Sequence, residues 1–287
     1  MKILVTGATG NVGRLVTEGL LDAGVDVRAL TRNPAGAGLP AGAEVVAGDL
    51  SEPDTLRKAL DGVERMYLFP IPQAVREVVG AAERAGVRRV VTLSSGAVTA
   101  GFDTTHHLPV EQAVEASGME WTHVRPGEFA TNKVALWGPS IREERVVRHP
   151  NLDVVWFPVH ERDIADVAVL ALLGDGHHGA AYTVNGPPVS LRDQVRAIAE
   201  AVGEEIRCER VTPEEARERY VRQGGFAAVA ADFLLGFVDH AGNPADPHAP
   251  AAFDASALGP QPTVREVTGA APRTFAQWAR DHVADFR

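Results

Sequence analysis

Short apolar runs alternate with helical patterns along the first half of the chain. The apolar runs are typical of strands in a parallel sheet: Lys2–Thr6, Val25–Leu30, Glu44–Ala47, Arg65–Phe69, Arg89–Leu93 and Trp121–Arg125. Patterns with the helical period lie between them, at Val12–Ala23, Asp54–Leu60, Gln73–Ala85 and Pro109–Ala116. Gly24, Gly86 and Gly118 each stand where a helix would end and the next strand begin. This succession predicts repeated βαβ units and an α/β fold with a parallel sheet.

The pattern is less regular after Arg125. It predicts strands at Asp153–Phe157 and Ala181–Asn185, a helix at Arg162–Leu173 and a final helix from about Thr274 to Val283. Ser190 and Thr212 are expected helix N-caps, and Thr212 begins a capping-box sequence with proline at the first helical position. The stretch from His240 to Pro262 is rich in glycine, proline and alanine and predicts a long loop.

A glycine-rich turn joins the first strand to the first helix. Its GxxGxxG pattern runs from Gly7 to Gly13. Gly7 allows a tight turn, Gly10 lets backbone approach a pyrophosphate, and Gly13 lets the helix pack closely. The N-terminus of that helix favours an anion. We therefore expect the turn to bind a dinucleotide through Gly7, Thr9, Gly10, Asn11, Val12 and Gly13; the alternative is a glycine turn without a ligand.

The ends of the next strands indicate which dinucleotide is bound. An acidic residue normally contacts the ribose 2′-hydroxyl of NAD about 20 residues after the glycine motif. This chain has Arg32 there, and a guanidinium suits the 2′-phosphate of NADP(H). An ordinary surface arginine is the alternative. Asp49 and Leu50 follow the third strand, where we expect the adenine. Phe69 and Pro70 end the fourth strand and should border the nicotinamide.

These features predict a Rossmann fold, a doubly wound parallel sheet with a small C-terminal substrate lobe. We expect the 287 residues to form one unit. Its Rossmann core comprises residues 1–125 and 151–203, and its substrate lobe comprises residues 126–150 and 204–287.

Composition restricts the partners and the compartment. The net charge of −10 argues against nucleic acid and anionic membranes as partners, and we interpret the basic run at Arg142, Arg145 and Arg148 as a solvated face. A single cysteine, Cys208, indicates a reducing cytoplasm. No run has the roughly 18 apolar residues of a membrane helix, and a strand at the start leaves no room for a signal peptide. Composition does not predict the oligomeric state.

The sequence resembles the NmrA-like branch of the atypical short-chain dehydrogenases. The motifs that carry the resemblance are Thr6–Gly13, Gly48–Leu50, Val91–Ser95, Arg125–Phe129 with Asn132, His160–Asp166 and Gly269–Trp278. The resemblance implies cofactor contacts at Ser94, Ser95 and Pro126. The wider family uses a Tyr-x-x-x-Lys pair, and the register before Glu111 puts Asp103 at the tyrosine position and His107 at the lysine position. Ordinary alcohol dehydrogenase chemistry is therefore in doubt.

His107 is the candidate catalytic residue. Histidine has an unperturbed pKa of about 6.5, so it can donate a proton near neutral pH. The alternatives are a contact to the nicotinamide ribose and a purely structural role. Neither adjacent pair, His106-His107 or His177-His178, has the spacing of a metal site, and we expect no metal.

A flat apolar substrate suits the aromatic residues after the sixth strand. We expect it to contact Phe129, Trp137, Phe226 and Phe233. The last two belong to an apolar stripe at helical spacing that could equally be core.

Three functions remain open at this stage. The leading one is NADPH-dependent reduction of a quinone, an enone or a similar flat aromatic acceptor, because such acceptors take a hydride without a strong acid. The second is a non-catalytic regulator that responds to NADP(H) and binds a protein partner. The third is an epimerisation or cyclisation in a biosynthetic pathway. The sequence does not identify the substrate or the direction of reaction.

Overall fold

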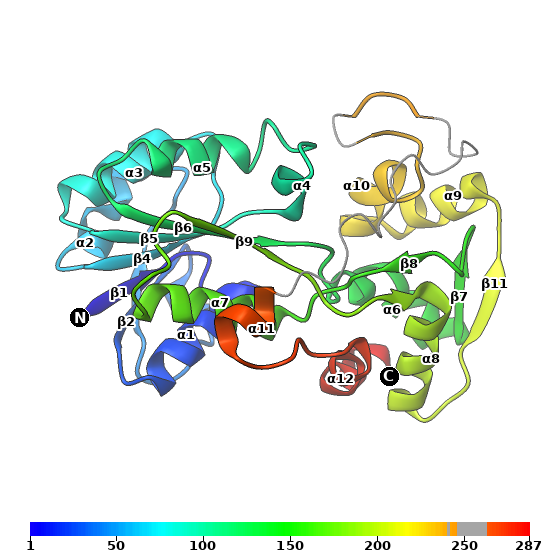
Figure 1. Cartoon of the computed structure of the whole chain (residues 1–287). Coiled ribbons are helices and arrows are strands. Elements are labelled where there is room, and N and C mark those ends of the chain that lie inside the picture. Colours follow the sequence, from blue (N-terminus) through cyan, green and yellow to red (C-terminus); the bar gives the residue numbers. More distant parts are fainter. Residues whose placement is uncertain (240–241, 246–262) are drawn as a thin grey trace. The chain divides into compact units, whose positions relative to one another are not determined.

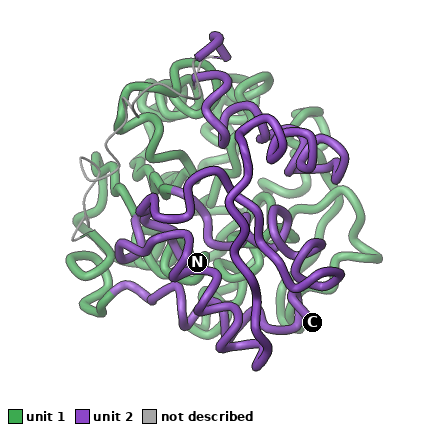
Figure 2. The backbone as a smooth tube through the Cα atoms, turned by 90° about the vertical axis from the view of Figure 1, so that its right-hand side faces the viewer, with its two compact units in different colours: residues 1–127, 161–184, 262–271 green, residues 128–160, 185–261, 272–287 purple. Residues whose placement is uncertain are grey.

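The computed structural model describes residues 1–239, 242–245 and 263–287 (Figure 1). The long loop expected from His240 to Pro262 falls largely outside these residues. The chain divides into two compact units, which Figure 2 shows in different colours. Unit 1 comprises Met1–Gly127, Glu161–Val184 and Pro262–Ala271. Unit 2 comprises Glu128–His160, Asn185–Gln261 and Pro272–Arg287.

Unit 1 is built on a seven-stranded sheet in the order β3-β2-β1-β4-β5-β6-β9. Its strands are β1 (Lys2–Val5), β2 (Asp26–Thr31), β3 (Glu44–Ala47), β4 (Arg65–Leu68), β5 (Arg89–Leu93), β6 (Glu120–Pro126) and β9 (Ala180–Val184). Every neighbouring pair is parallel. The order reverses between β1 and β4, as in a doubly wound nucleotide-binding sheet. The predicted Rossmann fold is confirmed.

Helices cover both faces of this sheet (Figure 1). One layer contains α1 (Asn11–Asp22), α7 (Glu161–Leu173) and α11 (Thr263–Thr268). The other contains η2 (Pro53–Leu56), α2 (Arg57–Leu60), α3 (Val75–Arg84) and α5 (Leu108–Glu115). The short elements η1 (Pro34–Gly36) and α4 (Gly96–Thr99) follow β2 and β5. Coverage on both sides explains why β1, β4 and β5 contain consecutive buried apolar residues rather than an alternating pattern.

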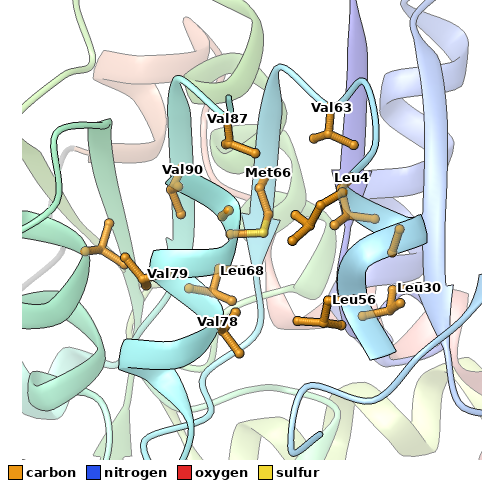
Figure 3. Close-up of a cluster of buried hydrophobic side chains, with 14 of the residues drawn as sticks. Leu4, Leu30, Leu56, Val63, Met66, Leu68, Val78, Val79, Val87 and Val90 are labelled. Atoms are coloured by element: carbon orange, nitrogen blue, oxygen red, sulfur yellow. The ribbon is translucent and has the colours of Figure 1, made fainter. Parts of the chain in front are cut away.

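The hydrophobic core of unit 1 lies between the sheet and the layer of α2, α3 and α5 (Figure 3). Met66 and Leu68 of β4 face Val78 and Val79 of α3, and each of these side chains is at most 4% exposed. Burying one such side chain contributes about 1.5–3 kcal/mol. This packing fixes the strand ends, and therefore the loops that follow them.

Unit 2 consists mainly of helices with two small sheets. Its helices are α6 (Asn132–Glu144), α8 (Leu191–Val202), α9 (Pro213–Gln223), α10 (Gly225–Leu234), α12 (Phe275–Asp281) and η4 (Val283–Phe286). β7 (Val146–His149) pairs parallel with β11 (Arg207–Arg210), and β8 (Val155–Trp156) pairs antiparallel with β10 (Val189–Ser190). The fully buried Trp278 lies in its core.

The two units divide the chain differently from the expected core and lobe, and unit 1 continues through Gly127. We expected residues 151–203 to belong to the Rossmann core, but only Glu161–Val184 of that range does so. Helix α8 packs against α12 in unit 2 instead. Conversely, Pro262–Ala271 belongs to unit 1, where α11 packs on α7.

Local signals at the helix starts agree with the predicted N-caps. The hydroxyl of Thr212 accepts the N–H of Glu215, whose carboxylate accepts the N–H of Thr212, which completes the capping box. The Ser190 hydroxyl accepts the N–H of Asp193 at the start of α8. No helix among the described residues is both long enough and apolar enough to cross a membrane.

Candidate functional site

The glycine turn lies at the carboxyl end of β1. Gly7 has a φ of 60°, a backbone angle that residues other than glycine rarely adopt. The N–H of Gly10 donates to the carbonyl oxygen of Gly7 at 3.0 Å, which closes the turn. Gly10 is also the N-cap of α1, and it has no side chain with which to cap the first N–H groups. The start of α1 is therefore suited to an external anion.

Gly13 makes the closest backbone approach in the turn. A Cβ atom at this position would lie 2.2 Å from the Gly7 carbonyl oxygen and 2.7 Å from the Gly7 carbonyl carbon. Real Cβ atoms essentially never approach that closely. The glycine thus lets α1 pack on the turn itself. Thr9 and Asn11 are exposed beside it, whereas the Val12 side chain is buried in the core.

Thr6 ties the turn to the end of β4. Its hydroxyl donates to the Tyr67 carbonyl at 2.9 Å and accepts the Phe69 N–H at 2.7 Å. The Phe69 ring lies against Gly7, within 3.0 Å of where a Cβ would stand, and the side chain is 45% exposed. Pro70 is buried. The expectation that Phe69 borders the nicotinamide stays a prediction, and the structure places its side chain on the glycine turn.

Arg32 stands exposed at the end of β2. Within the described part of the chain, no hydrogen bond or ion pair engages its guanidinium. The pKa of Asp49 is lowered by hydrogen bonds from Ser51 and, to a smaller extent, by the positive charge of Arg32. Leu50 packs partly against the core of unit 1. The residues expected at the adenosine end of a dinucleotide therefore lie close together, with one cation available.

Arg14 was not predicted, and it shapes the same region. From the second turn of α1 it donates to the carbonyl oxygens of Gly38 at 2.5 Å and Ala37 at 3.3 Å. These bonds hold the segment that follows Arg32 against α1. The only available sequence signal was an arginine directly after the last glycine of the motif.

Ser94 takes part in a buried polar network at the end of β5. Its hydroxyl donates to Glu111 Oε1 at 2.5 Å. Arg125 donates from Nε to the same oxygen at 2.9 Å and from Nη2 to Oε2 at 2.6 Å. Glu111 is 1% exposed. The expectation that Ser94 contacts the cofactor therefore needs correction for its side chain, because the buried carboxylate already holds the hydroxyl. Ser95 N-caps α4 by accepting the Ala97 N–H at 3.1 Å.

Glu111 stays ionised despite its burial. Burial raises the pKa of the carboxyl group. Hydrogen bonds from Arg125 and Ser94 lower the pKa by more than burial raises it, so the pKa lies below its ordinary value. Ion pairs of this kind are stable only when their hydrogen bonds are satisfied, which is the case here. The network fixes β5, β6 and α5 relative to one another. Pro126, also buried, ends β6 next to it.

Potential metal ligands gather beside this network rather than at the histidine pairs. Glu111, Glu115 and His123 offer ligand atoms within 4.8 Å of one another. The positively charged guanidinium of Arg125 already donates hydrogen bonds to both carboxylate oxygens of Glu111. That charge disfavours a cation at this place, so the group is best described as an ion-pair network.

His107 precedes the first residue of α5, in the segment that follows β5 and α4. In Figure 1 this segment lies beyond the carboxyl end of the sheet, the edge where ligands of such folds bind. The imidazole Nδ1 lies 2.5 Å from Asp103 Oδ2, and the side chain is 23% exposed. The sequence had singled out both residues, but not the contact between them.

The residues expected to contact substrate all belong to unit 2. Trp137 is 2% exposed and lies in the core of that unit, with the Lys133 ammonium 4.8 Å from its ring. Its expected substrate contact is therefore corrected to a packing role. Phe226 and Phe233 on α10 are 44% and 42% exposed, so this stripe does not form core. Phe129 is half-buried and forms a bridge with Val159.

Comparisons with known proteins show which proteins this sequence and fold resemble. The sequence model of a family described as NAD(P)H-binding matches residues 7–175. A (4-alkanoyl-5-oxo-2,5-dihydrofuran-3-yl)methyl phosphate reductase of Streptomyces griseus subsp. griseus is 37% identical over 99% of both chains. An NAD(P)H azoreductase of Xenophilus azovorans is 34% identical, again over 99% of both. The structure of an NADPH-dependent quinone oxidoreductase from Escherichia coli is 25% identical, with a TM-score of 0.73 over 98% of this chain and 99% of that one.

Proposed function

We propose that this chain, which belongs to the NAD(P)H-binding family and is an NAD(P)H-dependent oxidoreductase, lies in the NmrA-like branch of the atypical short-chain dehydrogenases. We propose that NADPH is its reductant and that it reduces a flat, conjugated acceptor such as a quinone or an enone. The observation that carries the choice of NADPH is the exposed guanidinium of Arg32 at the end of β2.

NADPH carries a phosphate where NADH carries a hydroxyl. A charge-assisted hydrogen bond contributes about 1.5–3 kcal/mol, which corresponds to roughly 10- to 100-fold in affinity. An acidic residue at this position would repel that phosphate, and this chain has none at the end of β2. Arg14 supports the preference because it holds the segment after Arg32 in place.

The chemistry of the relatives supports a conjugated acceptor. The three names describe reductases of an oxo-dihydrofuran, an azo compound and a quinone. Each of these compounds has an electron-poor π-bond, which accepts a hydride readily. Such a reaction needs only a weak proton donor, whereas an unactivated ketone needs a strong one. The replacement of the Tyr-x-x-x-Lys pair by Asp103 and His107 agrees with an acceptor of the first kind.

His107 supplies the proton in this proposal. NADPH held at the glycine turn and Arg32 would supply the hydride for the acceptor, whose conjugated oxygen would then need a proton. The imidazolium N–H of His107 transfers its proton to that oxygen. The hydride and this proton would together give the acceptor two electrons and two hydrogens, NADP⁺ would be the oxidised product, and His107 would regain its proton from water. Phe69, exposed on the glycine turn, offers an apolar surface beside the reacting ring.

Two measurements test the proposal. Oxidation of NADPH followed at 340 nm should occur with small quinones or enones, and the absence of turnover across a broad panel would refute the reductase function. Calorimetry should show that Arg32→Gln weakens NADPH binding about 10- to 100-fold and leaves NADH binding unchanged. Arg84→Gln is the matched control, because Arg84 is an exposed arginine in the last turn of α3.

A further inference from the structure

The Asp103 carboxylate gathers hydrogen bonds from the irregular segment between α4 and α5. Its Oδ1 accepts the backbone N–H groups of Thr105, His106 and His107 at 3.3, 2.9 and 3.1 Å. Its Oδ2 faces His107 Nδ1 at 2.5 Å. The backbone N–H of Asp103 itself donates to the Ala97 carbonyl at 3.1 Å, which attaches the segment to α4. Oδ1 therefore accepts only backbone N–H groups, whereas Oδ2 faces the imidazole and also accepts the His107 backbone N–H at 3.2 Å.

The ionisation of Asp103 determines which atom carries the hydrogen. Burial raises the pKa of this carboxyl group, but the hydrogen bonds from His107 and from the backbone outweigh burial and bring the pKa below its ordinary value. An ionised carboxylate only accepts hydrogen bonds. Nδ1 of His107 must then be the donor, which leaves Nε2 as the atom that exchanges a proton with a ligand.

The neighbouring His106 does not compete for this role. Its ring lies edge-on to that of His107, with centroids 4.7 Å apart. Burial, and then the proximity of His107, lower the pKa of His106. The side-chain hydrogen bond to Asp103 belongs to His107, whereas His106 contributes its backbone N–H.

We propose that Asp103 is a positioning residue that fixes the tautomer and orientation of His107, so that Nε2 delivers the proton to the reduced acceptor. The inference rests on the proposed function, because it assigns His107 the role of proton donor. In this role Asp103 acts through the imidazole, since the hydrogen bonds of its carboxylate go to its own segment and to His107. The pair supplies from a carboxylate and an imidazole what the wider family obtains from tyrosine and lysine.

Asp103→Asn is the variant that separates the two tasks of the side chain. The amide oxygen takes the place of Oδ1 and keeps the three backbone donors. The amide NH₂ takes the place of Oδ2 and presents a hydrogen to Nδ1. Nδ1 must then accept, and the ring changes to the tautomer with hydrogen on Nε2. We expect turnover per NADPH-binding molecule to fall about 10²-fold, with the affinity for NADPH within twofold of wild type.

Asp285→Asn is the matched control in unit 2. His282 Nδ1 lies 2.9 Å from Asp285 Oδ2, a contact of the same chemistry and nearly the same spacing along the chain. The same substitution there should leave turnover unchanged. Counting active molecules by bound NADPH corrects both variants for any loss of folded protein.

The tautomer itself is read from the ¹⁵N shifts of labelled histidine, with His107 assigned by comparison with His107→Gln. For the neutral ring, after Nε2 has given up its proton, we expect hydrogen on Nδ1 in the wild type and on Nε2 in Asp103→Asn. An Asp103→Asn variant that turns over like Asp285→Asn, in an active enzyme, would overturn the positioning role, as would an unchanged tautomer. An inactive wild type would refute the proposed function first, and the role of Asp103 with it.

Discussion

Replacing Gly13 with alanine tests whether the glycine turn requires the close approach of α1. The added methyl carbon would stand 2.2 Å from the Gly7 carbonyl oxygen. Favourable contacts begin near 3.5 Å, so helix and turn must separate by about 1 Å. Alanine gains about 1 kcal/mol in helix propensity. Overpacking against backbone costs about 1–3 kcal/mol, and the backbone here cannot rotate away as a flexible side chain would.

The net effect on folding is a loss of up to about 2 kcal/mol, or roughly 2–8 °C in Tm. We expect a larger effect on cofactor binding, because the displaced N–H groups are those that we propose bind the pyrophosphate. Loss of one charge-assisted hydrogen bond weakens the binding of NADPH at least about tenfold. Thermal melts with and without NADPH, together with calorimetry, measure both quantities.

Gly80→Ala provides the matched control for this prediction. Gly80 also lies within a helix, α3, and a Cβ there would meet only the mobile end of Arg84, at 3.1 Å. Its Tm should stay the same or rise by a few degrees through helix propensity, with NADPH affinity unchanged. If Gly13→Ala behaves like Gly80→Ala in both assays, the close approach is not needed and the reasoning fails.

Three further predictions concern the stability of the fold. Glu111→Gln leaves the Arg125 guanidinium without its anion and should lower the free energy of unfolding by about 3–5 kcal/mol; urea denaturation that shows no loss would contradict the buried network. Because the folded pKa of Glu111 is depressed, its stabilisation is present above pH 4.5 and disappears as pH falls through the folded pKa. Below pH 4.5 the Tm of the wild type should therefore fall more steeply than the Tm of Glu111→Gln. Parallel profiles of Tm against pH would refute the stabilising role of the ionised Glu111. Thr212→Ala removes the hydroxyl of the capping box and should lower the free energy of unfolding by about 1 kcal/mol. In thermal melts, the control Thr104→Ala, at an exposed position, should change the stability little.

The first half of the chain was predictable because its signals are local. β3 and β5 begin and end at the predicted residues, since each is an apolar run bounded by polar residues or glycine. The capping box at Thr212 was visible for the same reason. These features depend on neighbours in sequence and on burial from both faces of the sheet.

Unit 2 was harder because its elements depend on distant partners. β7 and β11 pair across some 60 positions, and neither run is apolar enough to indicate a strand. Helix α6 was not predicted because Pro139 lies inside it. Trp137 was assigned to substrate because its burial depends on helices that arrive later in the chain.

The site shows the same limit. The Asp103–His107 contact spans only four positions, yet the segment between the two residues is irregular, so helical spacing alone did not predict it. The Ser94 hydroxyl was assigned to the cofactor because sequence gives the position of a side chain but not the direction in which it points. Glu111, which holds that hydroxyl, lies on another element.

The proline inside α6 has a consequence for how this chain can vary. Pro139 has no N–H, so the Ala135 carbonyl loses its partner within the helix. The Gln223 amide, from the end of α9, donates to that carbonyl instead. The hydrogen bond uses the backbone carbonyl of residue 135 and the side-chain amide of Gln223. Position 135 is thus free to change, whereas proline at 139 and an amide donor at 223 should be gained and lost together.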